Sequence, residues 1–171
     1  LGTNTSFTDL GLTPSTHYYY RIYTVDKAFN YSSAISADAS TTAPSYASEP
    51  TTQASNVTFA NITSTGFDIN FTAGDGTNNI VLVKSGSAVD GNPSDGNSYS
   101  ANTVFGTGIQ IGTGNYVVYN GTGTTVTVTG LTKATSYFVK VFSFNGSAGS
   151  ENYLITNPAS GNQLTLPGEI I

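Results

Sequence analysis

Hydrophobic and polar positions alternate with a period of two through much of the chain, which predicts β-strands. The clearest case lies at residues 65–72, where three apolar side chains share one face: Phe67, Ile69 and Phe71. A continuous apolar run at residues 80–83 is typical of a buried central strand. No window places apolar residues at helical spacing, so we predict an all-β fold.

Short strands of this kind recur between turns rich in Gly, Asn and Ser. They are predicted at residues 6–8, 19–23, 57–59, 65–72, 80–83, 116–119, 125–128, 138–142, 153–155 and 164–166. Asn120-Gly121 predicts a hairpin turn, because both residue types accept a positive φ. Many short strands separated by turn residues indicate a β-sandwich.

An internal repeat relates residues 11–18 (GLTPSTHY) to residues 130–137 (GLTKATSY). Each copy is followed by an aromatic, alternating strand. The two copies are offset by 119 residues, the separation of Tyr18 and Tyr137. A β-sandwich takes about 100 residues, so this offset fits one sandwich with an insertion.

The repeat therefore divides the chain into modules. Residues 1–43 are expected to be the C-terminal part of one module, and residues 51–167 a whole second one with a long insertion at 85–114. Residues 44–50, with two prolines, are expected to form a short, extended linker, and residues 168–171 to begin a further one.

The repeated segments resemble the fibronectin type III family. The resemblance is carried by Leu12, Pro14, Thr16, Tyr18 and Arg21 in the first copy. In the second copy Leu131 and Tyr137 occupy the matching positions. The family implies tandem immunoglobulin-like β-sandwiches, the first represented only by its last three strands. It also implies that Tyr18 and Tyr137 form "tyrosine corners", in which the hydroxyl bonds to nearby backbone.

The second copy departs from the family pattern, because Phe71 stands where a Trp is usual. Its Gly-rich stretch at residues 105–114 is similar to a variant repeated in large secreted surface proteins of gliding and polymer-degrading Gram-negative bacteria. Such proteins often leave the cell by the type IX route. This resemblance implies an extracellular or cell-surface location and neighbouring domains in the same larger chain.

Charge and composition exclude several classes of partner. The net charge is −5, from 5 basic and 10 acidic residues, so there is no basic patch for nucleic acid. No apolar run approaches the roughly 20 residues of a membrane helix, so direct insertion is not expected. The chain has no Cys, hence no disulfide and no thiolate metal site.

Catalytic chemistry is not expected. His17 is the only histidine, and its place beside Tyr18 in the corner directs its side chain to solvent. Nucleophilic triads need a base beside the nucleophile, and glycosidases need two carboxylates across a cleft. The carboxylates here are scattered among turns. We therefore predict a non-enzyme without cofactors.

A calcium loop is one candidate metal site. Asp90, Asn92 and Asp95 lie in one Gly- and Asn-rich loop, and calcium prefers oxygen ligands at alternate positions. Asp95 is out of step with that spacing, and no acidic residue closes the loop. Ordinary turn chemistry accounts better for these residues.

Outward aromatic side chains mark candidate binding faces. In the first module these positions are Tyr19, Arg21 and Tyr23, and in the second they include Phe138 and Phe142. Exposed aromatic stripes often mark contact surfaces. In the second module we favour intramolecular cover by the apolar residues of the 85–114 insertion. In the first, sugar stacking and packing on a neighbouring domain remain equally open.

Three strands cannot close a seven-stranded sandwich, so the first module needs strands from upstream sequence or from another chain. Upstream sequence is the simpler source. The leading hypothesis is a non-catalytic spacer, adhesive or interaction module of a larger secreted bacterial protein. The alternatives are a carbohydrate-binding accessory module and a subunit of a cell-surface or secretion assembly, with protein or polysaccharide as the partner.

Overall fold

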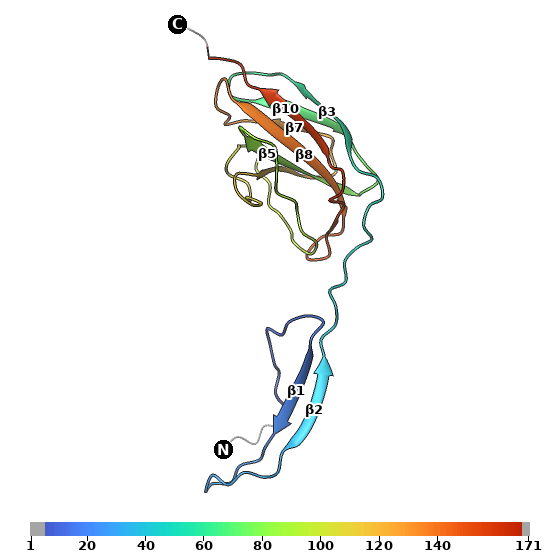
Figure 1. Cartoon of the computed structure of the whole chain (residues 1–171), viewed down its shortest axis with the longest axis vertical. Helices are drawn as coiled ribbons and strands as arrows, with labels where there is room; N and C mark the ends of the chain where they lie inside the picture. The colour runs from blue at the N-terminus through green and yellow to red at the C-terminus, as the bar shows by residue number, and fades with distance from the viewer. Residues whose placement is uncertain (1–5, 169–171) are drawn as a thin grey trace. The chain divides into compact units, whose positions relative to one another are not determined.

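The computed structural model describes residues 6–168, and the chain forms two compact units (Figure 1). Unit 1 is Leu1–Ser45 and unit 2 is Tyr46–Ile171. All regular structure at residues 6–168 is β-strand, which confirms the all-β prediction. The described part of the chain holds no helix able to cross a membrane.

Unit 2 is a β-sandwich of two antiparallel sheets. One sheet has three strands in the order β3-β4-β7: β3 (Ser55–Ala60), β4 (Phe67–Thr72) and β7 (Thr125–Val128). The other has the order β10-β8-β5-β6, with β9 also paired to β8: β5 (Asn78–Ser85), β6 (Tyr116–Gly121), β8 (Ser136–Asn145), β9 (Asn152–Tyr153) and β10 (Ala159–Leu164). This arrangement is an immunoglobulin-like sandwich.

The main core lies between the two sheets. It is formed by residues that alternate along facing strands, among them Phe67, Ile69 and Phe71 of β4 and Tyr137, Val139 and Val141 of β8. The ring of Phe67 meets the ring of Tyr137 edge-on, with centroids 6.3 Å apart. Alternation buries one face of each strand, as the sequence pattern predicted.

A second core lies on the opposite face of the five-stranded sheet. Residues 86–115, which connect β5 to β6, cover this face. Outward side chains of the sheet, among them Leu82 and Phe142, pack there with Val89, Tyr99 and Ile111 of the connection. The continuous apolar run of β5 is explained by this arrangement, because the strand is buried on both faces.

Three predictions in unit 2 are wrong in detail. The strand predicted at residues 153–155 is β9, which ends at Tyr153. Asn120-Gly121 is not a hairpin turn, because β6 runs through both residues and pairs them with Ile80 and Asn79. β6 and β7 belong to different sheets, so the chain crosses between sheets at this point. The last strand ends at Leu164, whereas the sequence pattern predicted it at 164–166.

Unit 1 contains one antiparallel hairpin of two strands, β1 (His17–Ile22) and β2 (Ile35–Ser40). The strand predicted at residues 6–8 is absent. These residues belong to no β-ladder. The equivalent strand of unit 2, β7, pairs with β4, and the described residues of unit 1 contain no such partner. A β-strand forms when its backbone N–H and C=O groups pair with those of a neighbouring strand. The lack of such a neighbour explains why residues 6–8 form no strand whereas β7 does.

The boundary between the units lies inside the segment expected to be a linker. Ser15 N–H donates to Thr42 O at 3.3 Å within unit 1. Ala47 N–H donates to Ser150 O at 2.8 Å, so unit 2 already holds this residue. Of the further linker expected at 168–171, residues 169–171 lie outside the described residues.

Candidate interaction surfaces

A tyrosine corner is present in both units. Tyr18 Oη accepts a hydrogen bond from Thr13 N–H at 2.8 Å, and Tyr137 Oη accepts one from Thr132 N–H at the same distance. Both corners include a residue at positive φ in equivalent position, Ser15 at 52° in unit 1 and Ala134 at 51° in unit 2.

A threonine from the last strand region fastens each corner. Thr41 Oγ1 accepts from Thr16 N–H at 3.0 Å and donates to Thr13 O at 2.6 Å. In unit 2, Thr165 Oγ1 makes the equivalent bonds, to Thr135 N–H at 3.0 Å and Thr132 O at 2.7 Å. The sequence repeat is thus also a repeat of hydrogen-bond geometry, although sequence reasoning missed the threonines.

The outward aromatic face of unit 2 is covered. Phe142 has no exposed surface, and Phe138 is half-buried against the same cluster. Tyr99 and Ile111 of the 86–115 connection supply the cover. Phe142 is therefore not part of a binding face, because the connection buries it, and the expected intramolecular cover applies at this position.

Phe105, expected to join that cover, packs elsewhere. Its ring lies edge-on to Tyr116 and to Tyr137, with centroid distances of 5.1 Å in both cases. It contributes to the main core at the corner rather than to the outer face. Its backbone N–H donates to Thr129 O at 2.9 Å, which places it beside the end of β7.

The outward face of unit 1 is exposed. Tyr19 is 81 % exposed, and Arg21 and Tyr23 are exposed beside it. The Tyr19 ring lies 4.5 Å from the imidazole of His17. His17 Nε2 is 2.9 Å from Asp38 Oδ2, and its Nδ1 is 2.8 Å from Ser40 Oγ. The polar groups of β2 thus hold the imidazole against the tyrosine ring.

Ser40, His17 and Asp38 are the residue types of a nucleophilic triad. Sequence reasoning missed the group, because the serine and the aspartate lie on the partner strand, Ser40 directly opposite His17. Acyl transfer also needs a substrate cleft and donors aimed at an oxyanion. The hollow of unit 1 is lined by other residues, so this group lies on open sheet surface and its visible role is to orient Tyr19.

The three calcium candidates do not converge. Asp90 accepts from Lys84 Nζ at 2.7 Å and from Asn115 Nδ2 at 2.9 Å, and these bonds hold the pKa of its carboxyl below the usual range. Asp95 accepts from Tyr153 N–H at 2.8 Å, and Asn92 is exposed. Within residues 6–168, no three His, Cys, Asp or Glu side chains gather in a metal-binding group.

Glu151 is a buried carboxylate that sequence reasoning missed. Burial alone would raise its pKa, but hydrogen bonds from Ser98 Oγ and the Gly149 N–H outweigh burial, so the pKa lies below its usual range. Its backbone O accepts from Gly96 N–H at 2.9 Å. These bonds fasten the 86–115 connection to the loop between β8 and β9.

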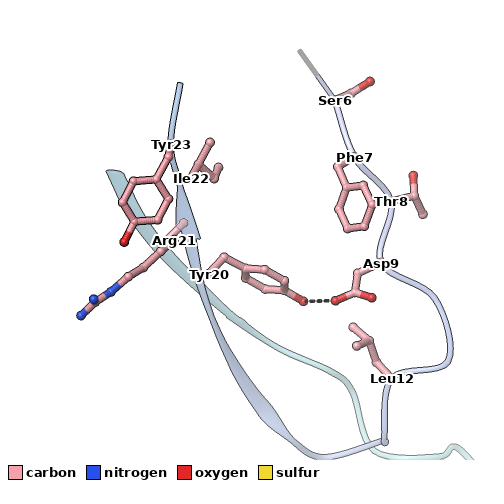
Figure 2. A pocket seen from close by; sticks show the side chains of 10 residues that line it. Ser6, Phe7, Thr8, Asp9, Leu12, Tyr20, Arg21, Ile22 and Tyr23 are labelled. Carbon is pink, nitrogen blue, oxygen red and sulfur yellow. Dashed lines mark hydrogen bonds between the residues drawn. The ribbon is translucent and has the colours of Figure 1, made fainter. Parts of the chain in front are cut away.

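The inner face of unit 1 is a wide hollow of about 940 Å³ (Figure 2). Apolar side chains from β1 and from residues 6–12 face one another across it, among them Phe7, Leu12 and Ile22. Tyr20 Oη donates to Asp9 Oδ2 at 3.2 Å across the hollow. Partial burial and this carboxylate raise the pKa of Tyr20.

Comparisons with known proteins give low similarities. The chain matches no model of a known protein family and none of the curated proteins. Among solved structures, a computer-redesigned β-sandwich protein has a TM-score of 0.46 and 17 % identity, over 68 % of this chain and 97 % of that one.

Two natural proteins are similar at the same level. A fibronectin type III domain derived from the human KIAA0970 protein has a TM-score of 0.44 and 14 % identity, over 70 % of this chain and 77 % of that one. The extracellular region of rat CD45, domains d3-d4, has a TM-score of 0.41 and 16 % identity, over 96 % of this chain and 72 % of that one. The fold class itself rests on the strand order and the two corners.

Proposed function

We propose that this chain is a non-catalytic structural and interaction segment of a larger bacterial protein, located outside the cell or on its surface. One observation carries the non-catalytic part: the carboxylates with perturbed pKa values are engaged in holding loops and strands. The bacterial and extracellular part is supported by the resemblance of the stretch at residues 105–114.

The direction of the pKa changes supports a structural role. Hydrogen bonds hold the pKa of Asp26, Asp68, Asp75 and Asp90 below the usual range, and that of Glu151 is also lowered. A general acid at neutral pH needs a carboxyl whose pKa is raised toward 7. These groups stay ionised and act as hydrogen-bond acceptors.

Intact mass and peptide mapping of the natural protein test this proposal. We expect a much longer polypeptide in which these units join other domains. A natural chain of this length alone would contradict a spacer role and favour a subunit of a surface assembly. Co-purification of a second protein in stoichiometric amount would also favour a subunit of a surface assembly over a spacer.

Carbohydrate binding by the outward face of β1 and β2 is the second candidate. The observation that favours it is the exposed Tyr19 ring, whose neighbour His17 is fixed by Asp38 and Ser40. An aromatic ring offers an apolar face to the C–H groups of a sugar, and adjacent carboxylate and guanidinium groups bond its hydroxyls. Arg21 and Asp38 supply such groups on the same face.

Binding to a panel of insoluble polysaccharides tests the second candidate. We expect Tyr19→Ala to reduce retention at least tenfold if this face binds sugar. Phe29→Ala is the matched control, because Phe29 is similarly exposed but lies in the turn between the strands. Equal retention of both variants, or no retention of the parent chain, would reject carbohydrate binding and leave the structural role untouched.

A further inference from the structure

A lysine, an aspartate and an asparagine meet where the 86–115 connection leaves and rejoins the sheet. Lys84 lies near the end of β5, Asp90 lies early in the connection, and Asn115 directly precedes β6. Lys84 Nζ donates to Asp90 Oδ1 at 2.7 Å, and Asn115 Nδ2 donates to the same oxygen at 2.9 Å. One carboxylate oxygen therefore bridges an amine and a primary amide.

The amine and the amide are largely withdrawn from water. The side chain of Lys84 is 14 % exposed, and Asn115 has no exposed surface. A Cβ added to Gly114 would lie 3.7 Å from Lys84 Cε, so the lysine stem runs along the backbone next to Asn115. Holding two groups side by side in a folded chain replaces a bimolecular encounter by an intramolecular one, which accelerates a reaction between them by orders of magnitude.

Asp90 contacts every atom of the amide that would change in such a reaction. Its backbone N–H donates to Asn115 Oδ1 at 3.2 Å. Negative charge develops on a carbonyl oxygen when an amine adds to its carbon, and a backbone N–H aimed at that oxygen stabilises the charge. The carboxylate of Asp90 lies within hydrogen-bond distance of both nitrogens, so it is placed to carry a proton from Nζ to Nδ2.

We propose that Lys84 and Asn115 form an intramolecular isopeptide bond, with Asp90 as the proton-transfer group. Nζ of Lys84 attacks Cγ of Asn115, and the bond between Cγ and Nδ2 breaks. Two protons pass from the lysine ammonium to Nδ2 by way of the Asp90 carboxylate. Nδ2 leaves as an ammonium ion, the carboxylate is regenerated, and no oxidant or other co-reactant is needed. Asp90 is exposed, which gives the ammonium ion a path to solvent.

This bond fastens the two ends of the segment that covers the second core. The chain has no Cys, so no disulfide can do so. Closing a loop covalently restricts the unfolded chain and thereby stabilises the folded one. The reaction occurs once in each chain and on the chain itself. It is therefore independent of whether the protein is a spacer or binds a polysaccharide, and either proposal can fail without the other.

Intact mass spectrometry of the purified chain, after incubation at neutral pH, is the first test. We expect a mass below that of the sequence by one ammonia, about 17 Da. A protease that cleaves before Asp90 and Asp95 separates Lys84 from Asn115 unless the two are linked, so we expect one branched species that contains both. The full sequence mass, with two separate peptides, would overturn the proposal.

Three variants show whether the lost ammonia comes from this bond. Lys84→Arg keeps a cation beside Asp90, but the guanidinium stays protonated and forms no amide, so we expect the full mass. Asp90→Asn removes the proton acceptor and should also restore the full mass. Lys140→Arg, on β8, is the matched control and should keep the lower mass.

A lower mass that persists in Lys84→Arg would overturn the proposal as well. Cyclisation of an asparagine that precedes a glycine also releases ammonia, and the chain has such pairs at 120–121 and 145–146. Cooperative thermal unfolding of each variant checks that it is folded, so that a restored mass reports the missing reactive group rather than a lost structure.

Discussion

The β1–β2 pair of unit 1 and the β8–β10 pair of unit 2 both have a tyrosine corner and a threonine, Thr41 or Thr165, that bonds to the backbone of the corner. The two strands of each pair are also in the same register relative to the corner. The two pairs differ in what covers the two faces of the sheet. In unit 2 the sheet is covered on one face by β3, β4 and β7 and on the other by residues 86–115. In unit 1 the outer face of the hairpin is exposed, and residues 6–12 cover the inner face only in part.

The comparison separates local from non-local causes of structure. The corner forms in both units because its partners lie within a few residues of one another or on the adjacent strand. Burial depends on strands far away in the chain, and unit 1 lacks them among its described residues. An isolated hairpin of this kind is marginal in water, whereas a sandwich is stable.

The largest expected contrast lies at one pair of equivalent outward positions, Phe142 and Tyr23. Phe142→Ala removes a fully buried ring from the second core and should destabilise unit 2 by about 3–5 kcal/mol. Tyr23→Ala removes a ring that is 47 % exposed and contacts the ring of Tyr31 edge-on, so it should change stability by less than about 1 kcal/mol. Urea unfolding of each variant measures both, and equal effects would contradict the cover by residues 86–115.

The buried carboxylate offers the next contrast. Glu151→Ala removes hydrogen bonds to an ionised group and should destabilise unit 2 by about 1.5–3 kcal/mol. Asp9→Ala in unit 1 removes one exposed bond, to Tyr20, and should have little effect on thermal unfolding. A negligible effect of Glu151→Ala would mean that it does not fasten the 86–115 connection.

Acidification should show how much the ionised Glu151 carboxylate contributes to the stability of unit 2. The folded-state pKa of Glu151 lies below its ordinary value of 4.5, so its contribution is fully present above that pH. The contribution is lost as the pH falls through the lowered pKa. We expect the melting temperature of the parent chain to drop below pH 4.5 more steeply than that of Glu151→Gln. Parallel curves for the two proteins would assign the acid sensitivity to other groups.

The tyrosine corners give a smaller contrast. Tyr137→Phe leaves the partly buried Thr132 N–H without its acceptor and should cost about 1–3 kcal/mol. Tyr18→Phe affects an exposed bond, which water replaces, so a change below about 0.5 kcal/mol is expected. Chemical denaturation measures the first, and the amide chemical shift of Thr13 reports the second.

The smallest expected contrast concerns two glycines at a φ of +73°, Gly11 and Gly130. Alanine at either position bears the left-handed strain of about 1–2 kcal/mol. At Gly130 the added Cβ would also lie 2.9 Å from Val104 Cγ1, whereas at Gly11 nothing lies within 4 Å. Displacing Val104 from its rotamer should add about 0.5–1.5 kcal/mol at Gly130 only. A difference of zero in thermal denaturation would mean that Val104 moves freely.

Much of the fold follows from local pattern. The period-two alternation in β4 and β8, the apolar run of β5 and the corner repeat all depend on residues close in sequence, and they predicted an all-β sandwich. β10 was less visible, because its sequence, ASGNQL, has no apolar alternation. Its place comes from the backbone ladder with β8, to which side-chain pattern contributes little.

The candidate surfaces were predictable only in part. Alternation alone predicts that Tyr19, Arg21 and Tyr23 point outward, and all three are exposed, but Arg21 and Tyr23 also border the hollow. The position of the His17 imidazole beside the Tyr19 ring was not predictable. Asp38 and Ser40, which hold this imidazole, come next to His17 only through the register of β1 with β2. The role of Glu151 was hidden for a similar reason, since Ser98 reaches it from 53 residues away.

The sequence by itself determined the strand type, the repeat and the two corners, because each rests on side-chain alternation or on hydrogen bonds between near neighbours. Tertiary structure alone decided which aromatic faces are free. Phe142 and Tyr23 occupy equivalent places in one pattern, yet one ring is buried and the other exposed. The physical reason is that burial depends on the long connection 86–115 and on distant strands, whose position no local pattern encodes.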